Sequence, residues 1–141
     1  MKKYVALIAV ATLAACAQTE SESETESVEE VIEEAVPVGA DGEPSPGLYT
    51  VTTAEGEVFL EDVKADGTYV TTNAEGEVIE TGQWEQKSPE AYCTIVDEEY
   101  REEGETGEQS CNTEGINEDG VWFSTNAEGK TATVERATPE E

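Results

Sequence analysis

The chain has 141 residues, of which 34 are Asp or Glu and only 7 are Lys or Arg, so its formal net charge at pH 7 is −27. This charge excludes an electrostatic nucleic-acid binder and argues against docking on anionic lipid head groups. The chain contains no histidine, which removes His-based catalytic triads, His metal sites and the commonest general base.

Residues 1–15 have the layout of a secretory signal peptide. Two lysines precede the apolar run 5–13, which is too short to span a bilayer. The tetrapeptide Leu13-Ala14-Ala15-Cys16 resembles the lipobox of bacterial lipoproteins. The resemblance implies that Cys16 begins the mature chain and carries a diacylglyceryl group and an N-acyl lipid, which anchor the protein in the membrane. The alternative is ordinary cleavage after Ala17, which would give a secreted or periplasmic soluble protein.

Residues 16–46 are predicted to be the lipidated cysteine followed by a disordered acidic linker. Ten acidic residues and no Lys or Arg lie between residues 17 and 46, so this segment repels itself and buries little apolar surface. Alanine, and not aspartate, follows Cys16. By resemblance to lipoprotein sorting, this favours the outer membrane, with the protein facing the periplasm or the outside. The run Pro44-Ser45-Pro46-Gly47 marks the boundary of the folded part.

Residues 47–137 are predicted to form one small all-β domain, followed by a tail at 138–141. One turn chemistry recurs five times, with a polar residue first and glycine fourth, which is typical of a three-residue hairpin loop. The turns are Thr53-Ala54-Glu55-Gly56, Lys64-Ala65-Asp66-Gly67, Asn73-Ala74-Glu75-Gly76, Asn117-Glu118-Asp119-Gly120 and Asn126-Ala127-Glu128-Gly129.

These turns predict an antiparallel meander of about eight short strands. We favour an up-and-down barrel, and the alternative is a two-sheet sandwich. Tyr49, Tyr69 and Trp122 each precede a turn glycine by seven residues, which predicts that all three point into the core. The residues expected to point inward from the returning strands are Val58, Leu60, Val78, Trp84, Ala132 and Val134.

The remaining cysteines, Cys93 and Cys111, form an even pair in an exported protein and are predicted to make a structural disulfide. The bridge would frame an acidic loop, which is the candidate contact surface. A redox pair is the less favoured alternative, because there is no C-x-x-C spacing.

No metal site and no catalytic residue are predicted. Acidic clusters offer oxygen ligands suited to Ca²⁺, but no D-x-D-x-D-G loop is present and the Asp-Gly and Glu-Gly pairs are already explained as turns. Low-affinity calcium binding therefore stays an alternative. The clusters are Glu61-Asp62, Asp97-Glu98-Glu99, Glu102-Glu103 and Glu118-Asp119.

The whole chain resembles small bacterial lipoproteins. The resemblance rests on the lipobox, the acidic linker, the cysteine pair and the segments Gly47-Leu48-Tyr49, Asp66-Gly67-Thr68-Tyr69, Gly82-Gln83-Trp84 and Asp119-Gly120-Val121-Trp122. The resemblance implies a cellular location and a fold type but no activity. We therefore expect a non-enzymatic accessory or interaction protein of the envelope, with no cofactor beyond the lipid on Cys16 and with a possible protein partner. The alternative is an inhibitor of a basic enzyme such as lysozyme, which strong acidity would attract.

Overall fold

The computed structural model describes residues 35–138, and the compact unit begins at Val36. The signal peptide, Cys16 and most of the predicted linker lie outside the described residues. Eight strands follow one another: β1 (Gly47–Thr52), β2 (Val58–Val63), β3 (Thr68–Thr72), β4 (Val78–Ser88), β5 (Ala91–Val96), β6 (Ser110–Ile116), β7 (Trp122–Thr125) and β8 (Thr131–Arg136). A short 3₁₀ turn, η1 (Glu98–Tyr100), lies between β5 and β6.

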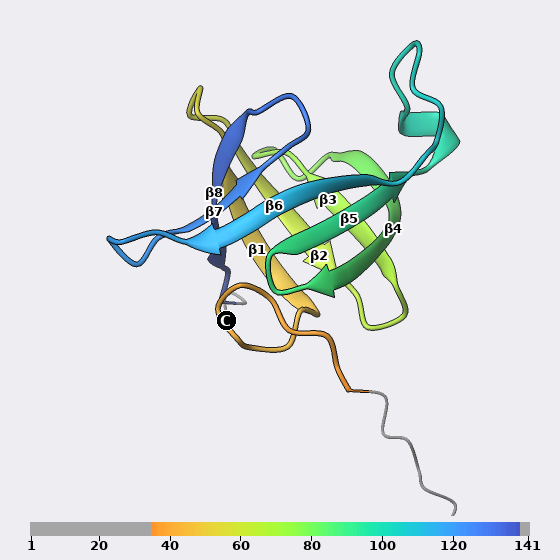
Figure 1. Ribbon diagram of the computed structural model, residues 1–141. Helices are drawn as coiled ribbons and strands as arrows, with labels where there is room; N and C mark the ends of the chain where they lie inside the picture. Colours follow the sequence, from red (N-terminus) through yellow and green to blue (C-terminus); the bar gives the residue numbers. More distant parts are fainter. Residues whose placement is uncertain (1–34, 139–141) are drawn as a thin grey trace, which may run out of the picture. The chain divides into compact units, whose positions relative to one another are not determined.

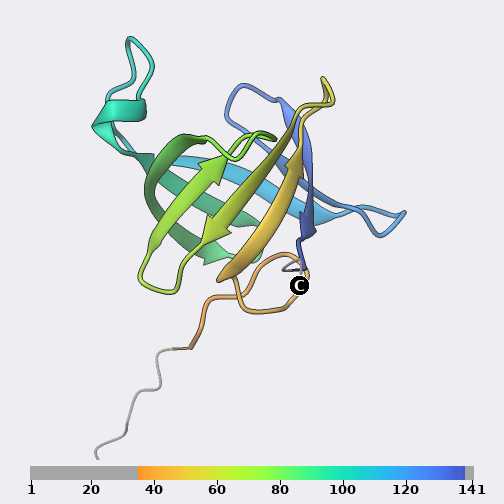
Figure 2. The ribbon, with the colours of Figure 1, turned by 180° about the vertical axis from the view of Figure 1, so that it is seen from behind.

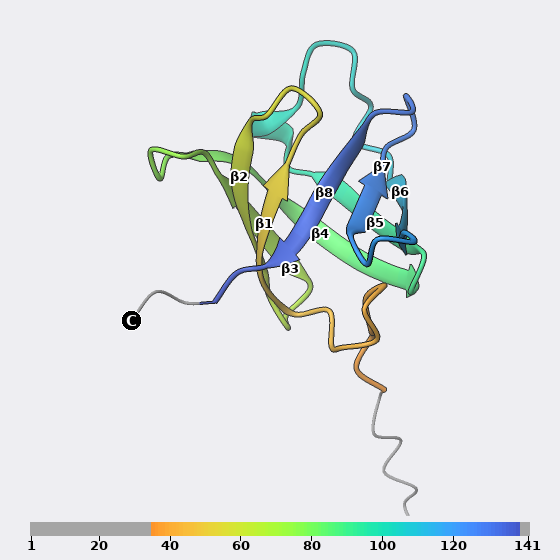
Figure 3. The same cartoon turned by 90° about the vertical axis from the view of Figure 1, so that its left-hand side faces the viewer.

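The strands form a closed antiparallel barrel in sequence order, which confirms the up-and-down barrel (Figure 1). Each strand pairs with the next along the chain, and Figure 2 shows β1, β2 and β3 side by side from behind. The barrel closes where β8 lies beside β1, with Val51 opposite Val134 (Figure 3). Closure leaves neither terminal strand with an unpaired edge.

The five predicted turns fix the hairpin geometry. In each of them the fourth residue is a glycine with positive φ, between 78° and 87°. The first hairpin illustrates the pattern: Gly56 N donates to Thr53 O at 3.0 Å and Thr53 N donates to Glu57 O at 2.9 Å. Because residues with a side chain rarely adopt positive φ, these glycines set the position of each turn and therefore the strand register.

The predicted core aromatics are buried, but part of the inward set on the returning strands was wrong. Tyr49, Tyr69 and Trp122 are buried, as predicted, and so is Val134. In contrast, the other members of the predicted set on β2 and the start of β4 are exposed, namely Val58, Leu60 and Val78.

The reason is register. Tyr49 lies opposite Glu61, and directly opposite residues point to the same face of a sheet. An inward Tyr49 therefore brings Glu61 inward and turns Leu60 outward. On β4, a bulge opposite Thr71 and Thr72 changes the alternation, so Val78 pairs with the outward-facing Thr72.

Residues 36–46, here called the strap, pack against the barrel instead of belonging to the linker. An isolated bridge between Val38 and Pro44 closes the strap into a loop. Gly39 lies so close to Trp122 that an added Cβ would be 2.8 Å from the indole ring. Ser45 is only 2% exposed and its Oγ donates to Gln86 Oε1 at 3.2 Å.

An ion pair also holds the strap to the barrel. The Arg136 guanidinium donates through two nitrogens to the Asp41 carboxylate, and it lies 5.1 Å from the centre of the Tyr49 ring. The strap precedes β1, so it lies at the end of the barrel where β1 begins, next to the chain's last strand (Figure 1). Within residues 35–138, no helix has the length and apolar character needed to cross a membrane.

Candidate ligand-binding site

The barrel encloses a cavity of about 960 Å³. In a barrel of eight strands, the interior is just wide enough to be filled by side chains or to hold one small ligand. Here several inward positions carry short side chains, including Val51, Val63, Ser124 and Ala132. They leave a space within the range of about 300–1,000 Å³ that is usual for small-molecule sites.

The cavity runs from the strap to the opposite end of the barrel. At the strap end its wall includes Ser45, Tyr49 and Trp122. At the other end it is lined by the β1–β2 turn, residues 53–57, and the β7–β8 turn, residues 126–131. These two turns lie together at the end away from the strap (Figure 1), so the strap closes one end and the turns form the rim of the other.

Aromatic rings give the cavity its apolar surface. Tyr49 and Trp122 meet edge to face with ring centres 5.6 Å apart, and Val63 and Val134 complete the buried cluster around them. Tyr92 lines the cavity from β5 and stacks on Trp84, with ring centres 6.2 Å apart. Offset and edge-to-face contacts of this kind hold the rings in fixed positions.

Carboxylates also face this interior. The Glu61 carboxylate lies among protein atoms and accepts a hydrogen bond of 2.6 Å from the Tyr92 hydroxyl. Burial raises the pKa of Glu61, the Tyr92 hydrogen bond lowers it, and the nearby charge of Glu80 raises it further. Glu80 itself accepts a hydrogen bond of 2.6 Å from the buried Tyr69 hydroxyl.

Glu114 is the most unusual residue of the site. It lies on β6 opposite Ser124 and is only 6% exposed. Its Oε2 atom is buried and makes no hydrogen bond. Burial raises the pKa of Glu114 to about 7 and the charge of Glu61 adds to the increase, against the smaller opposing effects of the Gln86, Ser124 and Trp122 side chains. These polar neighbours favour the ionised form, yet none has the geometry of a hydrogen bond to Oε2.

Trp122 contributes a second unsatisfied group. Its side chain is 7% exposed and its Nε1 atom is buried without a hydrogen-bond acceptor. Buried polar groups in native proteins almost always have a partner, which can be water or a ligand. The Trp122 side chain also acts on the Glu114 carboxylate, whose pKa it lowers, so these two buried polar groups belong to the same region of the cavity wall.

The lining is acidic overall. It includes four glutamates, Glu55, Glu57, Glu61 and Glu114, and a single basic residue, Lys130, which is exposed at the rim. Within residues 35–138, no three His, Cys, Asp or Glu side chains converge as a metal ion would require. The acidic lining can thus attract positive charge.

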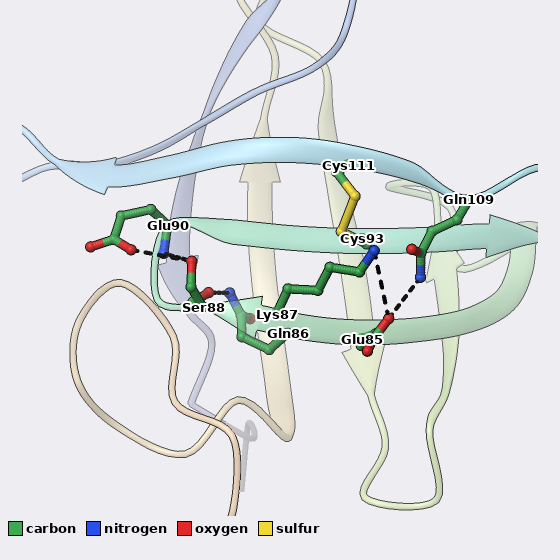
Figure 4. The surroundings of a disulfide bond; sticks show 8 residues. All are labelled: Glu85, Gln86, Lys87, Ser88, Glu90, Cys93, Gln109 and Cys111. Atoms are coloured by element: carbon green, nitrogen blue, oxygen red, sulfur yellow. Dashed lines mark hydrogen bonds and ion pairs between the residues drawn. A yellow bond between two sulfur atoms is a disulfide. The ribbon is translucent and has the colours of Figure 1, made fainter.

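The structure brings the two predicted disulfide cysteines together. Cys93 on β5 lies directly opposite Cys111 on β6, and their sulfurs are joined with a Cα–Cα distance of 4.0 Å. Their neighbours Tyr92 and Asn112 line the cavity, so the bridge lies on the outer face of the barrel. Figure 4 shows it beside Glu85, which accepts a hydrogen bond of 2.9 Å from Gln109 and lies 4.0 Å from the Lys87 amine.

The acidic loop framed by this disulfide, residues 97–109, projects from the barrel (Figure 1). It begins with η1, and Arg101 holds it to the barrel by donating from Nε to Val96 O at 2.8 Å. As a contact surface for a basic enzyme such as lysozyme, the loop stays a prediction. Cys16 lies outside the described residues.

Sequence reasoning missed Glu61, Glu114 and the Trp122 N–H as site residues. The signal for Glu61 was present, because a three-residue loop at Gly56 pairs Thr52 with Val58 and therefore Tyr49 with Glu61. For Glu114 there was no comparable signal, since its strand follows the long loop 97–109 and its register depends on the disulfide and on β7. No family model, curated protein or solved structure matches this chain.

Proposed function

We propose that this chain is a membrane-anchored envelope lipoprotein whose barrel binds a small, partly apolar organic molecule without changing it chemically. The observation that carries the proposal is the cavity of about 960 Å³ inside the closed barrel. Its aromatic walls suit an apolar body, and its few buried polar groups suit specific recognition of one end of a ligand. The strap closes the end where the chain enters the barrel, so a ligand would enter between the β1–β2 and β7–β8 turns.

A cavity-filling variant tests the binding function. Ala132 lines the cavity on β8, whereas its neighbour Thr133 is exposed on the outer face. The probe is the neutral dye N-phenyl-1-naphthylamine, whose fluorescence increases when it leaves water. We expect Ala132→Trp to weaken dye binding by about tenfold or more, because the indole would occupy the space, and Thr133→Trp to leave it unchanged. Equal binding by both variants and the unaltered chain would place the dye elsewhere and contradict the proposal.

The lipid anchor is supported by the residues before and at Cys16, Leu13-Ala14-Ala15-Cys16. Two or three acyl chains give stable anchoring where one chain would be marginal. We expect the unaltered chain in the membrane fraction of bacterial cells and the Cys16→Ser variant in the soluble fraction. Membrane association of Cys16→Ser equal to that of the unaltered chain would contradict the anchor and would leave the cavity proposal standing.

A further inference from the structure

Two buried polar atoms, Glu114 Oε2 and Trp122 Nε1, have no hydrogen-bond partner. They indicate a ligand-recognition site on one wall of the cavity. Both side chains are more than nine-tenths buried and both line the cavity. Their surroundings do not satisfy them: Asn112 Nδ2 donates to Ser124 Oγ at 3.1 Å, and Gln86 is engaged with Ser45 and Ser88. A buried carboxylate without a full set of donors is costly to retain. A ligand that donates hydrogen bonds and carries positive charge would relieve this cost.

The charges around Glu114 indicate that the ligand carries a positive charge. Glu61 acts on Glu114 through its charge, and both carboxylates act on Tyr49 and Tyr92. Both carboxylates line the same cavity, and like charges at low dielectric repel each other and favour a cation in the space that they share. The single lining base, Lys130, lies at the exposed rim, and no metal-binding group of three side chains forms within residues 35–138. An organic cation fits this lining, because its apolar body matches the aromatic wall of Tyr49, Tyr92 and Trp122.

We propose that the cavity selects organic ammonium ions, with the ammonium group donating to the Glu114 carboxylate and the apolar body against the rings of Tyr49, Tyr92 and Trp122. This inference rests on the proposed binding function and adds the ligand's charge and its point of recognition. The Arg136 guanidinium already lies over the Tyr49 and Trp122 rings, so it is the Tyr92 ring that can add a cation–π attraction to the ammonium group.

Binding of an ammonium ion should be linked to proton release. The groups that face Glu114 are Tyr49 on β1, Glu61 on β2, Gln86 on β4, Tyr92 on β5, and Trp122 and Ser124 on β7. Burial raises the pKa of Tyr49 to about 12 and that of Tyr92 further, so both tyrosines keep their protons near neutral pH. Glu114 has a pKa of about 7, and an adjacent cation would lower it and displace its proton.

Three probes of nearly equal size test the proposal: 4-phenylbutylamine, 4-phenylbutanol and 4-phenylbutyrate. They are titrated calorimetrically into the full chain at pH 8.0 and pH 5.5. At pH 8.0 we expect the amine to bind roughly tenfold or more tighter than the alcohol, and the carboxylate to bind most weakly, as for a charge-assisted hydrogen bond. At pH 5.5 the preference for the amine should shrink because Glu114 is protonated. At pH 7, titrations in two buffers of different ionisation enthalpy should show proton release with the amine only.

Glu114→Gln identifies the recognising group, and Glu135→Gln is the matched control because Glu135 is exposed on β8. We expect Glu114→Gln to bind the amine and the alcohol alike and to release no proton, while Glu135→Gln behaves as the unaltered chain. If the alcohol binds the unaltered chain as tightly as the amine, the charge selection is overturned although the cavity still binds ligands. If none of the three probes binds, both this inference and the proposed binding function fail.

Discussion

Glu114 is a buried carboxylate that lowers the stability of the folded chain and is also the group that we propose to recognise the ligand. Its pKa is raised from 4.5 to about 7 in the folded chain, so folding disfavours its ionised form. Such residues gather at functional sites, where a charged group must be available in a dry environment. The structure offers Oε2 no compensating hydrogen bond, which is the arrangement expected when a ligand supplies it.

This cost predicts a pH-dependent effect of Glu114→Gln on stability. Below pH 4.5 the carboxyl is neutral in both the folded and unfolded states, so the substitution should change little. Between pH 4.5 and 7 the folded chain keeps the proton longer than the unfolded chain, so the stability of the unaltered chain falls as pH rises. Above pH 7 the full cost of the charge is present, and Glu114→Gln should be more stable by up to about 3 kcal/mol.

Urea unfolding of the unaltered chain and of Glu114→Gln at pH 4.5, 6 and 8 measures this difference in the free energy of unfolding. Glu135→Gln, which removes an exposed charge on β8, controls for the overall reduction in negative charge. A difference between Glu114→Gln and the unaltered chain that is the same at all three pH values would show that the Glu114 charge carries no folding cost.

The strap is the element that covers one end of the barrel, so that the cavity opens only at the opposite end. Its close approach to Trp122 at Gly39, its buried Ser45 and its Asp41–Arg136 ion pair together cover one end of the cavity. The ion pair has two parallel hydrogen bonds, the geometry in which Arg–carboxylate pairs are strongest. The Arg136 guanidinium holds the pKa of Asp41 below its usual value, so the pair stabilises the fold above about pH 4 and its contribution is lost as pH falls further.

Asp41→Asn should therefore loosen the strap without unfolding the barrel. Because the pair is partly exposed, with side-chain exposures of 32% and 24%, we expect a loss of only about 1 kcal/mol at pH 7. Hydrogen exchange should accelerate at the Gly39 and Ser45 amides, which are bonded within the strap, and stay unchanged in the barrel strands. Asp119→Asn, in the exposed β6–β7 turn, is the control. Unchanged exchange at Gly39 and Ser45 in Asp41→Asn would show that the ion pair does not hold the strap.

For the whole molecule, two properties act together: a strongly acidic chain and a barrel with an acidic interior. The net charge of −27 raises the local concentration of cations around the molecule, and a cavity with low-dielectric walls focuses this field at its mouth. The buried cluster of Tyr49, Val63, Trp122 and Val134 is the hydrophobic core, and the same four residues form part of the cavity wall. A ligand that binds only the folded chain would add stability to this small core.

Local sequence patterns were enough to predict about eight strands, the hairpin turns and the cysteine pair, and they favoured a barrel over a two-sheet sandwich. These follow from local chemistry: five turn glycines that adopt positive φ, aromatic residues at a constant distance before them, and two cysteines in neighbouring strands. The inward positions of the core aromatics were predicted, but the polar side chains that face the interior depend on strand pairing in the folded barrel. Hydrophobicity suggested Val58 and Leu60, but pairing with Tyr49 puts Glu61 inside, and pairing of β6 with β7 places Glu114 opposite Ser124, so that it lines the same cavity. The acidic cavity arises from strand register, which depends on all eight strands at once, and residue type alone does not encode it.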